Sequence, residues 1–246
     1  HVYLDAVFYP NITEETFKQE GWHYELNSPK DKVVYKGVVL NEMKGEFSNP
    51  ESCIDRQLAH SLFPSTAYGF ESGGDPKNIP DLTYQDFTEF HRKHYHPSNS
   101  RLFFYGDGDT QSYLDFLQEK YLHDFAHMEV NTSIVHQRSF RKPKRKPMSY
   151  PVSSDESLEK KTYVLVGYKL DKAINHEHCL GFSILSHLLL GSSASPLRKA
   201  LITSELGSEV MGGGFDDNRA DTMFAVGLKG TELEHENEIL ALIDST

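Results

Sequence analysis

The 246-residue sequence contains no long apolar run and very little cysteine. No stretch approaches the roughly 20 apolar residues that a membrane-spanning helix needs, so we expect no membrane partner. The two cysteines, Cys53 and Cys179, lie far apart along the chain. Such a pair is more typical of two reduced, packed thiols than of a disulfide framework. This cysteine usage favours an intracellular or organellar compartment.

Positive charge is also scarce. The chain has 25 Lys and Arg residues against 36 Asp and Glu, which gives a formal net charge of -11. A nucleic acid, itself a polyanion, is therefore not expected to bind, whereas cationic peptides are favoured. The exception is 138–147, RSFRKPKRKP, where six of ten residues are basic. We interpret this cluster as a solvated linker or an exposed edge strand.

Several motifs that would indicate chemistry are absent or incomplete. The stretch 191–195, GSSAS, is not followed by Gly-Lys-Ser/Thr and lacks the flanking glycines of a nucleophile elbow, so we interpret it as a helix cap. The three glycines 212–214 indicate a bend at the end of a strand, although a glycine-rich edge could also let a peptide backbone approach.

Two groups of histidines could suggest a metal site. His123 and His127 are four residues apart, but they continue the polar face of a helix that we predict over 112–128. The second group lies where a predicted helix ends, and imidazolium groups there complement the helix dipole. We therefore interpret both groups as structural. The second group consists of His91, His94 and His96.

The order of predicted elements indicates an α+β fold with mainly antiparallel sheets packed with helices. In the second half a strand at 161–170 is followed by two helices, beginning at 176 and 196, and then by two strands. In the first half we predict helices capped by Ser48 and Thr83 and a strand at 101–105. Both ends of the sequence resemble helices in progress, so we expect a piece of a longer protein. The predicted parts are a first domain over 1–137, a linker over 138–159 and a second domain over 160–246.

Glu42 occupies an unexpected position. Tyr35, Val38, Val39 and Glu42 are spaced as one stripe of a helix, which places a carboxylate where a core-facing apolar side chain is expected. Burying an unpaired charge costs several kcal/mol, on the order of the cost of a broken buried ion pair. Glu42 therefore requires a cationic partner, and the residues alone leave open an ion pair with Lys or Arg, a metal ion or a general-base role.

The segments 35–45, YKGVVLNEMKG, and 71–107, which begins ESGGDPKNIPDLTYQDF, closely resemble the presequence protease branch of the pitrilysin/insulinase-type zinc metallopeptidases. The resemblance continues in the second half, at 187–201, HLLLGSSASPLRKAL, and at 224–231, FAVGLKGT. Only the region 128–159 is variable. The resemblance implies parts of two homologous α+β domains.

The resemblance also implies a zinc ion bound by His-x-x-Glu-His and by a glutamate from a later helix, which Glu42 in NEMKG matches. No His-x-x-Glu-His occurs in these 246 residues. The two histidine ligands and the catalytic glutamate are therefore absent, and Glu42 is the one metal ligand that we assign. Distant relatives have a second glutamate where this chain has Tyr35, and an aromatic residue there is typical of the presequence protease branch.

The implied function is that of a zinc endopeptidase which degrades unfolded peptides, such as cleaved targeting presequences in the mitochondrial matrix or plastid stroma. Its partners would be such peptides and the remainder of the parent peptidase. We expect this chain to be inactive alone. The alternative is a non-catalytic homologue in which the fold serves a structural or peptide-docking role.

Overall fold

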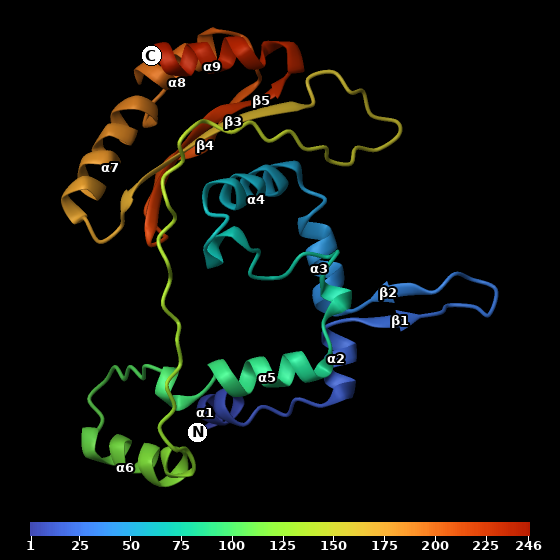
Figure 1. The fold of residues 1–246 in the computed structure, drawn as a ribbon, viewed down its shortest axis with the longest axis vertical. Helices are drawn as coiled ribbons and strands as arrows, with labels where there is room; N and C mark the ends of the chain where they lie inside the picture. Colours follow the sequence, from blue (N-terminus) through green and yellow to red (C-terminus); the bar gives the residue numbers. More distant parts are fainter. The chain divides into compact units, whose positions relative to one another are not determined.

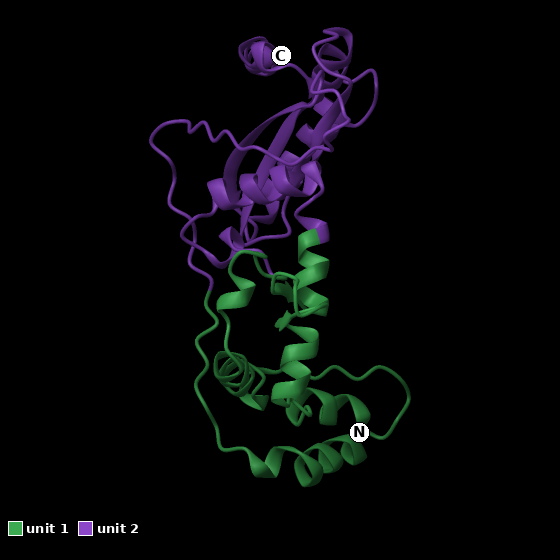
Figure 2. Cartoon of the chain, turned by 90° about the vertical axis from the view of Figure 1, so that its right-hand side faces the viewer, with its two compact units in different colours: residues 1–44, 73–133 green, residues 45–72, 134–246 purple.

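The computed structural model describes residues 1–246, which form helices and two small antiparallel sheets (Figure 1). The chain divides into two compact units (Figure 2). Unit 1 comprises 1–44 and 73–133, and unit 2 comprises 45–72 and 134–246. These units are a different division from the two predicted homologous domains, whose boundaries stay a prediction. No helix has the length and apolar character that crossing a membrane requires.

Unit 1 is mostly helical. Its core includes Phe8 and Tyr121, whose ring is 1% exposed. Thr83 begins a helix with a reciprocal capping box, because its side chain accepts from the Asp86 backbone N–H while the Asp86 carboxylate accepts from Thr83. The elements of this unit are α1 (Val2–Phe8), α2 (Glu14–Glu20), β1 (His23–Glu25), β2 (Val34–Lys36), α3 (Val38–Glu46, whose last two residues fall in unit 2), α5 (Tyr84–His94) and α6 (Thr110–Lys120).

The structure corrects three expectations for unit 1. Residues 101–105 form no strand, and the side chains of Phe103 and Tyr105 are 88% and 96% exposed. A strand needs a neighbour to accept its backbone hydrogen bonds, and no segment of this chain pairs with 101–105. The helix predicted over 112–128 ends at Lys120. Tyr35 belongs to β2 and not to the helix that follows.

Unit 2 contains a three-stranded antiparallel sheet of order β3-β5-β4, which confirms the predicted α+β class. Helices α8 and α9 pack on one face of the sheet, where Leu201 and Ile239 are fully buried. On the other face, Leu58 lies against Gly167 of β3. The elements are α4 (Pro50–Leu62), β3 (Thr162–Lys172), α7 (His176–Leu190), α8 (Pro196–Thr203), β4 (Glu209–Asp216), β5 (Asp221–Thr231) and α9 (Glu236–Ser245).

The sequence predicts Ser48 as the N-cap of α4, but the N-cap in the structure is Asn49. The Asn49 side chain accepts hydrogen bonds from two backbone N–H groups of the first turn. Ser48 instead donates its hydroxyl hydrogen to the carbonyl of Gly45. Because Pro50 has no backbone N–H and suits the first helical position, the residue directly before it is the natural cap.

Candidate functional site

Glu42 lies on α3 and its side chain faces solvent. The buried side of α3 is formed by Leu40 and Met43, and Met43 packs against Gly73. The stripe that we expected to face a core, with Val38 and Val39, is therefore exposed in this chain, and that expectation is wrong. Glu42 makes no ion pair and its carboxylate makes no hydrogen bond, so its carboxylate is free to accept a ligand.

The residues of this chain do not by themselves fit a zinc ion. Zinc in catalytic sites takes three protein ligands and a water molecule. No group of three or more His, Cys, Asp or Glu side chains is placed to hold a metal. Glu42 therefore supplies a single donor, and its assignment as a metal ligand stays a prediction.

The histidine groups are separated or otherwise engaged, in agreement with a structural role. His123 lies 3.1 Å from the carboxylate of its neighbour Asp124, whereas His127 lies near Ser98. His91 contacts the backbone carbonyl of Val7 through Nε2 at 3.0 Å. The ring of His96 accepts a hydrogen bond from a backbone N–H two residues later.

Glu46, one turn after Glu42 on the same helix, is neutralised by an arginine. Arg56 of α4 contacts Glu46 Oε2 at 3.2 Å and Glu71 Oε2 at 2.5 Å, and its guanidinium lies 4.4 Å from the centre of the Phe47 ring. The planar guanidinium can serve two carboxylates and an aromatic face at once. Glu46 thus has the kind of partner that Glu42 lacks.

A groove of about 410 Å³ lies beside α4 and is lined by the edge strand β4 and by its neighbour β5. Its glycines 212–214 all have positive φ angles, and the register between β4 and β5 shifts at this point. A Cβ at Gly212 would lie 2.7 Å from backbone atoms of β5, whereas at Gly213 it would meet open space. The lining residues are Glu51, Asp55, Leu58, Glu209, Val210, Met211, Gly212, Gly213, Gly214, Phe215, Asp216, Arg219, Met223, Ala225 and Lys229.

The groove is acidic, because four carboxylates line it against two cations. Lys229 lies 2.8 Å from Glu51 and 2.9 Å from Glu209, and these hydrogen bonds raise the pKa of Lys229 above its ordinary value. Asp55 has no cationic partner within ion-pair distance. Loss of water around its carboxyl and the nearby Glu51 charge raise the pKa of Asp55.

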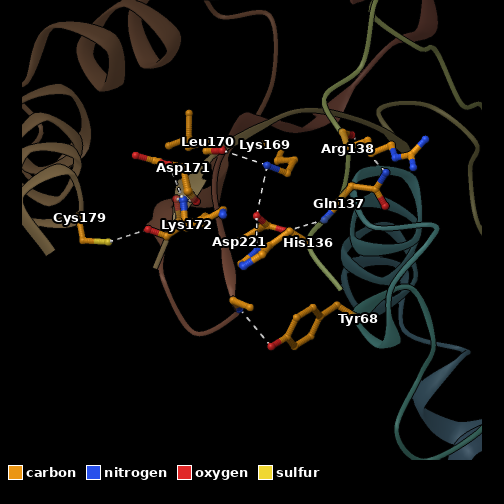
Figure 3. Close-up of polar contacts among 12 residues, drawn as sticks. Tyr68, His136, Gln137, Arg138, Lys169, Leu170, Asp171, Lys172, Cys179 and Asp221 are labelled. Atoms are coloured by element: carbon orange, nitrogen blue, oxygen red, sulfur yellow. Dashed lines mark hydrogen bonds and ion pairs between the residues drawn. The ribbon is translucent and has the colours of Figure 1, made fainter. Parts of the chain in front are cut away.

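A buried carboxylate in unit 2 was not singled out from the sequence (Figure 3). Asp221 begins β5, and its side chain is 3% exposed. Its oxygens accept from the Gln137 backbone N–H at 2.7 Å and contact Lys169 Nζ at 3.3 Å. His136 Nδ1 lies 3.1 Å from the same carboxylate. Hydrophobic patterning carries no signal for this cluster, because its members come from segments far apart in the chain.

Two opposing effects act on the pKa of the Asp221 carboxyl group. Burial alone raises the pKa of Asp221. The hydrogen bonds from Gln137 and His136, together with the nearby ammonium group, outweigh burial and hold that pKa below its ordinary value. The cluster therefore favours an ionised carboxylate that fixes 136–137 to the sheet.

Known proteins resemble the chain throughout its length. The model of the peptidase M16 inactive domain matches residues 81–246. Presequence protease 1, chloroplastic/mitochondrial, of Arabidopsis thaliana is 45% identical over 250 residues, which cover 100% of this chain and 23% of the relative. Protein HypA of Clostridium perfringens is 43% identical and the mitochondrial presequence protease of Xenopus laevis 38%; each match covers 100% of this chain, with 25% and 24% of the relative.

A solved structure supports the fold. A protease from Helicobacter pylori superimposes with a TM-score of 0.50 and 19% identity, covering 85% of this chain and 50% of that one. The chain spans about a quarter of the length of the curated relatives it matches. The family model and the identities over the full chain together show that this chain belongs to the presequence protease branch of the M16, or pitrilysin/insulinase-type, peptidase family.

Proposed function

We propose that the parent protein of this chain is a zinc-dependent endopeptidase that degrades unfolded peptides, such as cleaved mitochondrial or plastid presequences. The observation that carries this proposal is the 45% identity, over the whole chain, to a protein named presequence protease. The free carboxylate of Glu42 within the matching segment is consistent with a ligand role. The remaining ligands and the general base would come from residues outside this chain.

In this proposal the chain positions one zinc ligand, Glu42, and binds part of the peptide substrate. A zinc ion held by two imidazoles and a carboxylate activates a bound water molecule as a nucleophile near neutral pH. Glu42 would be that carboxylate, and its place is fixed because Leu40 and Met43 anchor the opposite side of α3. Because a single donor cannot hold zinc, we expect the 246-residue chain to be inactive alone.

The β4 groove favours extended and basic peptides. Edge strands bind extended peptides through main-chain hydrogen bonds, and Gly213 leaves space for a backbone to approach. The unpaired Asp55 and the net charge of -11 favour cationic segments. The same groove supports the second candidate function, a homologue that docks peptides without cutting them.

The location and partners that we propose for the parent protein rest on the names of its relatives. Several relatives are named as mitochondrial, and one as chloroplastic and mitochondrial. We propose a mitochondrial matrix or plastid stroma location for the parent protein, with unfolded peptides as substrates and the rest of the parent peptidase as the structural partner. Organelle fractionation of the tagged parent tests this location, and recovery outside both organelles would contradict it.

Cleavage assays on the parent protein separate the two candidate functions. We expect the parent to cleave an unstructured basic peptide and Glu42→Gln to lower the rate at least about 100-fold, because one metal ligand is lost. Glu46→Gln is the matched control, since Glu46 is on the same helix but pairs with Arg56. Binding of the peptide without cleavage by the unchanged parent would favour the docking homologue. Equal rates for Glu42→Gln and the unchanged parent would refute the role of Glu42.

A further inference from the structure

The segment 138–146, here called the basic segment, displays all its cations to solvent. It contains six Lys and Arg side chains, and each is exposed. No acidic residue occurs between Glu129 and Asp155. The segment forms neither helix nor strand, and its backbone bends at Arg141 and Lys142. It is thus a run of exposed positive charge on a chain that is otherwise acidic.

Most of these cations have no carboxylate partner. Arg145 binds Glu236 of α9 through two hydrogen bonds of 2.5 and 2.6 Å. Lys144 Nζ lies 4.6 Å from the centre of the Phe140 ring. The other four side chains form no ion pair, so their charges are available to a partner. These are Arg138, Arg141, Lys142 and Lys146.

The basic segment is held to unit 2 at several points. Before it, the backbone of Gln137 is bound by the buried carboxylate of Asp221 (Figure 3). Within it, Arg145 is fixed to α9. After it, the Tyr150 hydroxyl donates to the Lys161 carbonyl, and its ring packs edge-on against Tyr163 at 5.6 Å. A segment fixed in this way loses less conformational entropy on binding than a free tail does.

We propose that the basic segment binds the anionic surface of a phospholipid bilayer and attaches the protein peripherally to membranes. A charged bilayer surface is planar and fluid, so it needs no groove, only several cations within reach. Met148, two residues after Lys146, is 43% exposed and provides an apolar side chain next to the segment in sequence. Single-stranded nucleic acid is less well matched, because the segment has a single aromatic ring, Phe140, which is half-buried and has Lys144 over one of its faces.

This inference revises our expectation that membranes are not partners. That expectation rested on the lack of a long apolar run and concerned crossing a membrane. Peripheral attachment depends on local charge, and charges farther away than the Debye length of about 8 Å are screened at physiological salt. The overall charge of -11 therefore does not decide the behaviour of this segment. The inference is independent of the proposed peptidase activity.

Vesicle flotation tests the proposal with the 246-residue chain. The vesicles contain phosphatidylcholine either alone or mixed with phosphatidylserine. The test variant replaces Arg141, Lys142, Lys144 and Lys146 with Gln and leaves the Arg145 ion pair intact. The control variant replaces four exposed cations elsewhere, which make no ion pair, so the change in net charge is equal. These are Lys30, Lys32, Lys77 and Lys93.

We expect the unchanged chain and the control variant to float with the anionic vesicles and not with the neutral ones. The test variant should partition at least about tenfold more weakly, because each cation near an anionic surface contributes to binding. Raising the salt concentration should release the bound protein. Equal binding by the test variant, or equal loss in the control variant, would overturn the proposal. So would binding of a single-stranded RNA homopolymer without binding of anionic vesicles.

Discussion

The backbone N–H of Gln137 donates a hydrogen bond to the buried carboxylate of Asp221 across 2.7 Å, although 84 residues separate the two in sequence. The Gln137 side chain in turn accepts from the Ser65 backbone N–H at 3.0 Å. The two bonds join the segment that enters unit 2 at 134 to β5 and to the turn after α4. Asp221 is therefore expected to stabilise unit 2 strongly.

Replacing Asp221 with Asn should lower the free energy of unfolding by about 3 kcal/mol at pH 7, because the Lys169 ammonium and His136 lose their anionic partner. Urea denaturation of the 246-residue chain measures the change. Asp217→Asn, at an exposed position with no ion pair, is the control and should change stability by less than about 0.5 kcal/mol.

The comparison of the unchanged chain with Asp221→Asn also predicts how stability depends on pH. The pKa of Asp221 is lowered in the folded state, so its contribution is fully present above the unfolded value of about 3.9 and is lost as the pH falls through the folded value. The stability difference between the unchanged chain and Asp221→Asn should still be present at about pH 5 and shrink below about pH 4. A difference that keeps its full size at about pH 2 would contradict this assignment.

Two adjacent glycines of β4 should respond differently to alanine. Gly212 has a φ of +103°, and its Cβ would lie 2.7 Å from backbone atoms of β5, so Gly212→Ala should cost about 3 kcal/mol. Gly213 has a φ of +72° and open space around it, so Gly213→Ala should cost about 1 kcal/mol. Thermal or urea unfolding measures the loss of stability in each variant. A larger loss in Gly213→Ala than in Gly212→Ala would contradict the described contacts of these two glycines.

The ion pairs of Arg56 with Glu46 and Glu71 should need arginine and not simply a positive charge. Arg56→Ala should destabilise the chain by about 2 kcal/mol, because the Glu71 carboxylate is left without its partner and the Phe47 ring loses a packing contact. Arg56→Lys should recover less than half of the lost stability, since a single ammonium group cannot replace the several donors of a planar guanidinium. Arg92→Ala, at an exposed position without an ion pair, is the control. Full recovery by lysine would argue against a geometric requirement.

The exposed apolar segment 101–105 should make the 246-residue chain self-associate. A strand-forming sequence without a partner strand is a site for pairing between copies. Changing Phe103 and Tyr105 to Lys should raise the concentration at which aggregates appear in light scattering. Phe70→Lys, at a side chain that is 76% exposed and outside this segment, should have little effect. Similar behaviour of all variants would exclude this segment as the cause.

Signals local to the sequence predicted much of the fold. The helix predicted to be capped by Thr83 is found as α5 (Tyr84–His94), because Thr83 and Asp86 form a capping box within four residues. The helix predicted to begin at 176 is found as α7 (His176–Leu190), and the Asn175 side chain accepts a hydrogen bond from a backbone N–H of its first turn. The strand predicted at 161–170 from the alternation of its residue types is found as β3 (Thr162–Lys172).

The remaining features depend on partners that lie far away in the sequence. Residues 101–105 have strand propensity, but propensity cannot supply a neighbouring strand. The Glu42 stripe was expected to face a core, but the buried side of α3 is set by Leu40 and Met43. The ion pairs of Asp221 with Lys169 and of Lys229 with Glu51 join distant segments, so no local pattern indicates them.

The zinc content of the purified parent protein, measured by elemental analysis, is the most direct test of Glu42 as a zinc ligand. Zinc bound to the protein reports on the ligands without depending on substrate or on catalytic rate. We expect close to one zinc per molecule in the unchanged parent and in Glu46→Gln, and close to none in Glu42→Gln. Stoichiometric zinc in Glu42→Gln, or no zinc in the unchanged parent, would contradict it.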